Sequence, residues 1–254
     1  MRSFYRFKRL STYAPIVHQV SQKDQASAYL GSLALHTDEN PNEILQNRQQ
    51  IQAQYPQMKF VVAHQTHSAN IQVIERAESI GWETQETAIA DCDALLSNQE
   101  GVMLTILTAD CVPILLFDPT QKVVGAVHAG WNGTKKEILY KTIQKMQERF
   151  DSKPQDIIAG IAPSIGRCCY EVGADVAKHF FEDMDAMDRV GEKYMLDLPY
   201  INQQQLLKAG LKAENIELSG ICTACDVEHY FSYRQEQGCS GRFMSIIGLK
   251  GKSK

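Results

Sequence analysis

The amino-acid sequence predicts an α+β fold in a single domain that spans residues 1–254. Strand-like and helix-like segments intermingle along the chain, without the regular strand–helix–strand alternation of a doubly wound sheet. The composition, 44% hydrophobic and 22% charged, is that of an ordinary globular protein, and 254 residues can bury one sizeable core. No internal repeat and no linker rich in glycine, serine or proline divides the chain.

The first half of the chain predicts one surface helix followed by a series of strands. Asn40 can cap a helix, Pro41 suits its first position and Glu43 can complete a capping box, so we expect a helix from Pro41 to about Gln54. Strands are expected at 60–63 and 71–74. Four further segments, 94–96, 102–107, 113–117 and 123–127, are apolar at nearly every position, as strands buried on both faces are.

The second half predicts more helices between strands. Thr134 and Glu137 have capping-box spacing, and the apolar residues Leu139, Ile143 and Met146 recur behind them at helical intervals. We therefore expect an amphipathic helix that starts at Thr134 and packs on the sheet. Further strands are expected at 157–161, 216–221 and 243–249, and further helices at 174–181 and 201–209.

Charge and hydropathy exclude several kinds of partner. Lys and Arg total 26 against 30 Asp and Glu, so the net charge of −4 lacks the basic surplus of a nucleic-acid-binding protein. No segment approaches the ~20 apolar residues that cross a membrane, and no apolar signal-peptide region follows the basic first residues. The odd number of cysteines, seven, does not suggest a disulfide framework, and we expect a cytoplasmic protein.

Three turns place a possible metal ligand directly after an apolar strand. They lie at 64–67, 108–111 and 128–131, and they contain His67, Cys111 and His128. Two imidazoles and a thiolate suit Zn²⁺ and leave a fourth position for water, as in catalytic zinc sites. Asp110 could orient a ligand or carry a proton. Alternatively, Cys111 and His128 could be ordinary core residues.

The same segments resemble a known family. Thr108-Ala109-Asp110-Cys111-Val112-Pro113 and Val127-His128-Ala129-Gly130-Trp131-Asn132-Gly133 resemble the signature of a bacterial and metazoan family labelled laccase-domain, polyphenol-oxidase-like or purine nucleoside phosphorylase. The likeness extends over about residues 33–249. Other matching segments are Gln65–His67, Asp93–Leu95, Gly160–Gly166, Tyr170–Gly173, Cys222-Thr223, Phe231–Arg234 and Gly241-Arg242.

The resemblance implies a fold, a metal and an activity. The fold would be α+β, with mixed β-sheets packed together and flanked by helices. Zn²⁺ would be held by His67, Cys111 and His128, and the substrates would be purine nucleosides and phosphate. The implied reactions are phosphorolysis of adenosine, inosine and methylthioadenosine, and hydrolytic deamination of adenosine, for which Asp110 is the nearest candidate proton carrier.

One family motif is missing. The family carries a Thr-Arg-x-Gly-Gly segment near its N-terminus, whereas residues 18–24 here contain neither an arginine nor paired glycines. Lys23 could supply a point charge, but it cannot form the bidentate contact of an arginine. Arg48, Arg234 and Arg242 are the candidates for phosphate binding. We favour this role only for Arg48 and Arg234, and the alternative for each of the three is a solvated surface position or a structural salt bridge.

Three other functions remain open from the sequence. Cys111 with His128 as base could act as a cysteine hydrolase or amidase. A copper polyphenol oxidase is less compatible with seven histidines and no His-x-His pair, although Cu²⁺ could replace Zn²⁺ on the same ligands. The divergent N-terminal segment could also mark a non-catalytic binding module. The oligomeric state is left open.

The remaining cysteines give a weaker pattern. Cys222-x-x-Cys225 with His229 and Cys239 could form a small structural zinc site, but a single CxxC with irregular partners is weak support. We interpret the adjacent pair Cys168-Cys169 as two packing thiols.

Overall fold

The computed structural model describes residues 3–251, in which most strands belong to two large sheets. The five-stranded sheet has the order β1-β2-β14-β6-β3, the six-stranded sheet β13-β9-β7-β8-β5-β4, and a small sheet β10-β12-β11. The strands are β1 (Phe4–Tyr5), β2 (Ile16–Ser21), β3 (Lys59–Val62), β4 (Ile71–Ile74), β5 (Ala94–Ser97), β6 (Val102–Thr108), β7 (Val112–Asp118), β8 (Val123–Ala129), β9 (Ile158–Ile161), β10 (Glu171–Val172), β11 (Met187–Val190), β12 (Lys193–Leu196), β13 (Ile216–Leu218) and β14 (Phe243–Leu249). The α-helices are α1 (Pro41–Gln52), α2 (Trp131–Lys135), α3 (Ile138–Phe150), α4 (Ala174–Ala177) and α5 (Leu198–Lys208).

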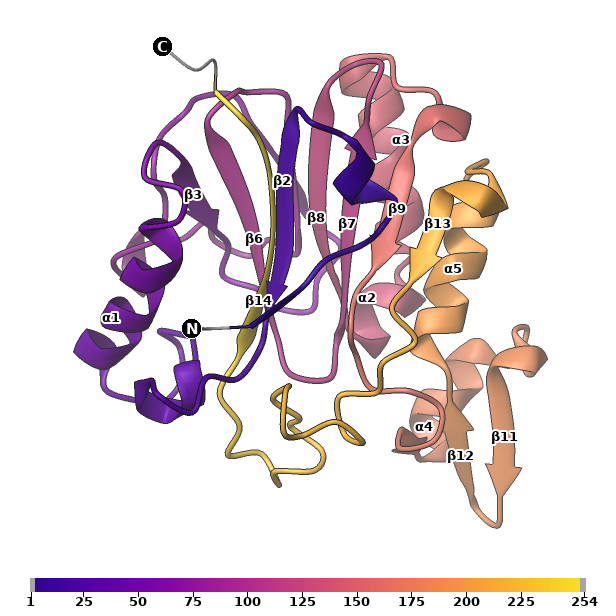
Figure 1. Cartoon of the computed structure of the whole chain (residues 1–254). Helices are drawn as coiled ribbons and strands as arrows, with labels where there is room; N and C mark the ends of the chain where they lie inside the picture. The colour runs from indigo at the N-terminus through magenta and orange to yellow at the C-terminus, as the bar shows by residue number, and fades with distance from the viewer. Residues whose placement is uncertain (1–2, 252–254) are drawn as a thin grey trace.

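The two large sheets pack face to face, and helices cover their outer sides (Figure 1). Helix α1 lies over the five-stranded sheet, and α3 and α5 lie over the six-stranded one. Both sheets mix parallel and antiparallel neighbours. In the five-stranded sheet β6 pairs parallel with β3 and antiparallel with β14, and in the six-stranded sheet β5 pairs parallel with β4 and antiparallel with β8. The predicted α+β fold with mixed, helix-flanked sheets is confirmed.

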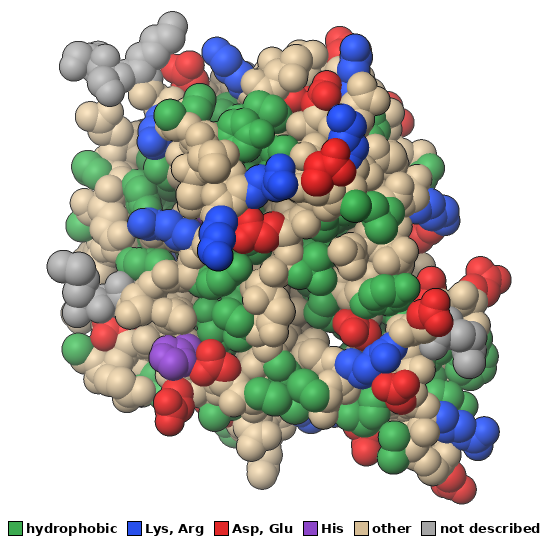
Figure 2. Space-filling model, turned by 45° about the vertical axis from the view of Figure 1, so that its right-hand side comes forward, with side chains coloured by type: hydrophobic (Ala, Val, Ile, Leu, Met, Phe, Trp, Pro, Cys, Tyr) green, Lys and Arg blue, Asp and Glu red, His purple; other side chains and the backbone are tan. Residues whose placement is uncertain are grey.

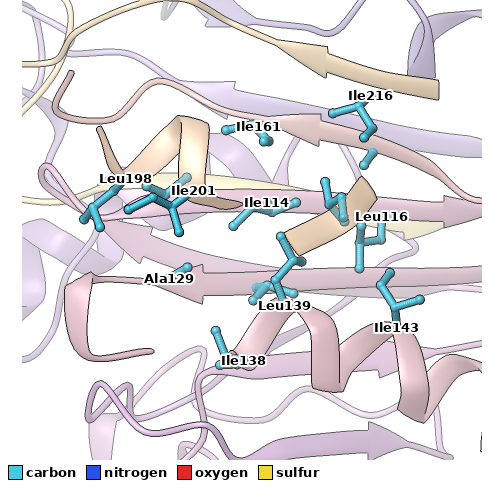
Figure 3. Packing of buried hydrophobic residues seen from close by; sticks show 14 of the residues in the cluster. Ile114, Leu116, Ala129, Ile138, Leu139, Ile143, Ile161, Leu198, Ile201 and Ile216 are labelled. Carbon is cyan, nitrogen blue, oxygen red and sulfur yellow. The ribbon is translucent and has the colours of Figure 1, made fainter. Parts of the chain in front are cut away.

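Strand β7 shows why the central segments are apolar at every position. Successive side chains of a strand point to opposite faces. Leu115 and Phe117 therefore pack between the two sheets, whereas Ile114 and Leu116 point toward the helices and pack with residues such as Leu139 of α3 (Figure 3). A strand covered on both sides has no polar positions to expose.

The helix expected to start at Thr134 is divided in two. Thr134 lies inside α2, and its hydroxyl accepts a hydrogen bond from Asn202 Nδ2 (3.0 Å) instead of capping a helix. Glu137 has a positive φ of 56°, which separates α2 from α3. Strand β2 and the β11–β12 hairpin were not predicted. The first helix is close to its prediction, with Asn40 Oδ1 accepting from the Asn42 N–H (3.0 Å).

The hydropathy of the helices and the charges on one face of the surface are relevant to membrane and nucleic-acid partners. None of the helices in the described part of the chain is long and apolar enough to cross a membrane. On the face shown in Figure 2, acidic and basic side chains are interspersed, and no continuous basic strip is visible there.

Candidate metal centre

Strand pairing brings the predicted ligands to one place. Strands β7 and β8 are antiparallel with Val112 opposite Ala129, so Cys111, just before β7, lies near the end of β8 that carries His128. Strand β5 pairs on the other side of β8 with Ala94 opposite Val127, which places Asp93 beside His128. Asp93 and Ala94 each donate a backbone N–H to Asn70 O (3.1 and 3.2 Å), so the turn that carries His67 lies beside Asp93.

The three donor groups are close enough to bind one ion. The ligand atoms of His67, Cys111 and His128 lie within 4.8 Å of one another. His67 Nε2 is 3.7 Å from Cys111 Sγ, and the two imidazole rings meet edge to face with centroids 4.8 Å apart. His128 is buried, Cys111 is half-buried and His67 is exposed, so the cluster is open on one side. This arrangement suits a metal that keeps an open coordination position.

Asp93 holds two of these ligands and was not singled out for this role from the sequence. Its buried carboxylate lies 2.7 Å from His128 Nδ1 and can only accept, so Nδ1 carries the hydrogen and Nε2 is left for a metal. The same carboxylate accepts backbone N–H bonds from Thr66, His67 and Ser68 (3.2, 3.1 and 2.7 Å). His67 adopts a positive φ of 59°, a conformation that costs a non-glycine residue about 1–3 kcal/mol. These hydrogen bonds to Asp93 hold it there.

The protonation states of the cluster are coupled. Burial alone raises the pKa of Cys111, but the imidazoles of His128 and His67 outweigh it and lower the pKa to about 6. Burial alone lowers the pKa of His128, but Cys111 and Asp93 raise it to about 9. Burial also opposes ionisation of Asp93, yet the hydrogen bonds from His128 and Ser68 hold its pKa well below the usual range. At neutral pH the metal-free site therefore contains a thiolate beside an imidazolium.

The donor cluster opens into a cavity of about 550 Å³, a size typical of small-molecule sites. The aromatic residues Trp131, Tyr170 and Tyr233 line it together with Arg234 and Arg242. The remaining lining residues are His36, Gln65, His67, Leu107, Thr108, Ala109, Asp110, Cys111 and His128.

Of the three candidate arginines, two line the cavity and one is buried away from it. Arg234 lies at the cavity and donates to Cys169 O (3.3 Å) and Glu171 O (2.9 Å). Arg242, the less favoured candidate, also lies there, fixed by a 2.9 Å bond from Nη1 to Gly241 O. The expected role of Arg48 is corrected: it is fully buried and donates to the carbonyls of Leu33, Gly81 and Trp82, so it holds loops together.

Two other predicted residues are held by hydrogen bonds. Lys23 donates to Val227 O (2.8 Å) and pairs with Glu236 (2.9 Å), and it does not line the cavity. Asp110 lies at the cavity with a φ of 82°, and both of its carboxylate oxygens are occupied. Oδ1 accepts from Thr223 Oγ1 and Oδ2 from the Arg234 N–H, each at 2.7 Å. This arrangement favours a positioning role for Asp110 over proton transfer.

Gly130 provides a direct test of the crowding at the cluster. A Cβ at this position would lie 2.8 Å from His67 Cδ2 and 2.9 Å from Cys111 Sγ. Gly130→Ala should therefore displace a ligand at a cost of about 1–3 kcal/mol, which weakens metal binding about 5- to 150-fold. Gly133→Ala is the matched control, because its Cβ would make ordinary contacts of 3.4 Å or more. Equal metal affinity of the two variants by competitive titration would argue against the packed cluster.

Together the fold and site define an α+β protein with a three-ligand candidate metal centre in a small-molecule cavity. Over residues 18–250 the chain matches the family described as "Multi-copper polyphenol oxidoreductase laccase", and it belongs to that family. The resemblance seen in the sequence motifs is thereby confirmed.

Named relatives cover most of the chain. It is 36% identical over 239 residues to "Purine nucleoside phosphorylase YlmD" of Bacillus subtilis, covering 91% of this chain and 85% of the relative. It is 34% identical over 198 residues to "Adenosine deaminase RL5" from an unknown prokaryotic organism, covering 75% of each. The crystal structure of YlmD from Geobacillus stearothermophilus superposes with a TM-score of 0.90 at 29% identity, over 99% of this chain and 100% of that one.

Proposed function

We propose that the protein is a zinc-dependent purine nucleoside phosphorylase that acts on adenosine, inosine and methylthioadenosine. The observation that carries the proposal is the convergence of His67, Cys111 and His128 in a cavity that also presents two arginines and three aromatic residues. The names of relatives such as the Bacillus subtilis protein support the same reaction class.

The donor set fits a borderline-soft divalent ion. Nitrogen and thiolate ligands with an open position suit Zn²⁺, and Cu²⁺ could occupy the same ligands, although a multicopper centre needs more imidazoles than the two in this cluster. An ion held by these residues would act as a Lewis acid toward an oxygen atom of a reactant. Asp93 orients His128 toward the ion position and favours metal binding through its negative charge.

The cavity walls can bind both substrates. The aromatic rings of Trp131, Tyr170 and Tyr233 offer surfaces on which a purine can stack. Arg234 and Arg242 offer guanidinium groups for phosphate, and Arg234 is pre-oriented by two backbone carbonyls and by the Tyr170 ring 5.4 Å away. In phosphorolysis a phosphate oxygen forms a bond to the ribose C1′ while the bond from C1′ to the purine breaks. The base leaves with that electron pair and takes up a proton.

Adenosine deamination is the second candidate, supported by the name of the 34% identical relative. Water replaces the amino group at purine C6 in this reaction, and ammonia leaves. It would use the same cavity without phosphate, so phosphate-independent ammonia release identifies it.

A cysteine hydrolase is the competing interpretation of the same residues. The low pKa of Cys111 beside His128 is also found in thiol nucleophiles. The second imidazole, His67, at 3.7 Å from the sulfur favours metal ligation. Activity that survives removal of the metal would support the hydrolase instead.

The test is phosphate-dependent release of adenine from adenosine by the metal-replete protein. We expect chelation to abolish the reaction and Zn²⁺ to restore it.

Arg242→Gln should raise the KM for phosphate about 10-fold or more, because a hydrogen bond to a charged group contributes about 1.5–3 kcal/mol. Arg149→Gln, a surface arginine paired with Glu75, is the control and should leave KM unchanged. Zinc-loaded protein that leaves adenosine and inosine intact would contradict the proposal.

A further inference from the structure

A second cluster of metal-ligand residues lies outside the candidate active centre. The Sγ atoms of Cys168, Cys169, Cys222 and Cys225 all lie within 4.8 Å of one another. Cys225 Sγ is 3.6 Å from Cys168 Sγ and 3.4 Å from Cys169 Sγ, and all four cysteines are free thiols. The CxxC pair therefore meets the adjacent Cys168-Cys169 pair and not His229, which instead lies 2.6 Å from Asp226. Cys168 is exposed and Cys169 half-buried, so the two thiols expected to pack in the interior lie instead in this cluster.

The spacing of the sulfur atoms matches a tetrahedral metal site. A Zn–S bond of about 2.3 Å places two ligands of a tetrahedron about 3.8 Å apart. The observed separations of 3.4 and 3.6 Å differ from this value by only a few tenths of an ångström. Cys168 and Cys225 are exposed and the other two are half-buried, so an ion can reach all four.

The backbone around Cys222 is arranged to support a thiolate. The Gly166 N–H donates to Cys222 Sγ at 3.3 Å. The N–H groups of Cys225 and Asp226 both donate to Cys222 O (3.2 and 3.0 Å), which folds the CxxC segment into a tight turn. The Sγ atoms of Cys222 and Cys225 lie within 4.8 Å of each other in this turn.

The cluster joins segments that otherwise have little regular structure. Between β13 and β14 the chain runs from 219 to 242 without a helix or strand, along the lower edge of the sheets in Figure 1. An irregular segment of this length is uncommon in a compact domain and usually has a function. The 219–242 segment carries Tyr233, Arg234 and Arg242 to the cavity. Because it contains no helix or strand, contacts other than regular backbone pairing must hold it in place.

We propose that Cys168, Cys169, Cys222 and Cys225 bind a second Zn²⁺ ion with a structural role. Four thiolates complete its coordination and leave no open position, as in structural zinc sites. The ion clamps the 219–242 segment to the loop before β10. Tyr170 directly follows Cys169, and Arg234 donates to the Cys169 carbonyl, so the clamp positions two residues of the cavity wall.

Metal counting on the full chain tests the proposal. Protein purified under reducing conditions, loaded with Zn²⁺ and freed of excess should contain two equivalents. Cys225→Ser and Cys168→Ser should each contain one equivalent, whereas Cys239→Ser, an exposed cysteine outside the cluster, should keep two. Cys225→His should retain the second ion, because three thiolates and one imidazole also form structural zinc sites. Equal zinc content in wild type, Cys225→Ser and Cys168→Ser would overturn the proposal.

Cobalt substitution separates this site from the candidate active centre. In Cys111→Ser protein, Co²⁺ should still give the intense visible bands and the sulfur charge-transfer band of a tetrahedral thiolate site. Adding Cys225→Ser should remove them. If the candidate active centre binds no metal, wild-type protein contains only one equivalent of zinc, but the Co²⁺ bands of Cys111→Ser protein remain. Absence of the bands in reduced Cys111→Ser protein, or recovery of the four thiols only as disulfides, would overturn the second site.

Discussion

Replacing Cys111 with alanine should reduce nucleoside phosphorolysis by more than ~100-fold and remove one equivalent of bound zinc. Loss of an outer partner of a metal ligand typically costs 10–100-fold, so loss of a ligand itself should cost more. Cys111 directly precedes β7, and its Sγ lies 3.7 Å from His67 Nε2.

The matched control is Cys239→Ala, because Cys239 is exposed and belongs to neither donor cluster. The assay is adenine release from adenosine at saturating phosphate, measured beside metal content and far-ultraviolet circular dichroism. A folded Cys111→Ala protein that keeps wild-type turnover would show that the thiolate is not required.

Replacing Asp93 with asparagine should weaken metal binding about 10- to 100-fold and shift the titration of Cys111. In metal-free wild type, the rate at which iodoacetamide alkylates Cys111 should have its midpoint near pH 6. The pKa of Cys111 is lowered to about 6, so the reactive thiolate is present above that pH. Asp93 helps to raise the pKa of His128 to about 9. Without that charge the imidazolium loses its proton at lower pH, so the pKa of Cys111 and the alkylation midpoint should rise.

Asp118→Asn provides the control for burial. Asp118 is also fully buried, but it accepts from the Thr120 and Gln121 N–H groups at the far end of β7. Its replacement should leave the alkylation midpoint unchanged. If Asp93→Asn titrates like wild type, Asp93 does not set the charge state of the cluster.

Local sequence patterns were sufficient for the central strands, and they identified His67, Cys111 and His128 as candidate ligands that the structure brings together. Unbroken apolar runs such as 112–117 identify strands covered on both faces, and His67, Cys111 and His128 each follow such a run. Residues at strand ends are often functional, so this pattern drew attention to the three residues, and the family resemblance then identified them as the expected metal ligands.

Residues whose roles depend on pairing between distant segments could not be predicted. Asp93 acts through its position opposite His128 across the β5–β8 pair, and no local feature shows this. Arg48 lies on a polar-looking helix, yet three backbone carbonyls from two loops surround it in the core. Cys168 and Cys169 meet Cys225 more than fifty positions later, through loops that have no periodic pattern.

Anomalous X-ray scattering at the zinc edge from crystals of the metal-replete protein would locate the ion directly. We expect a peak within bonding distance of one nitrogen of His67, one nitrogen of His128 and the sulfur of Cys111, with an open side toward the cavity that Arg234 and Arg242 line. Zinc-loaded crystals without a peak between these three side chains would contradict this expectation.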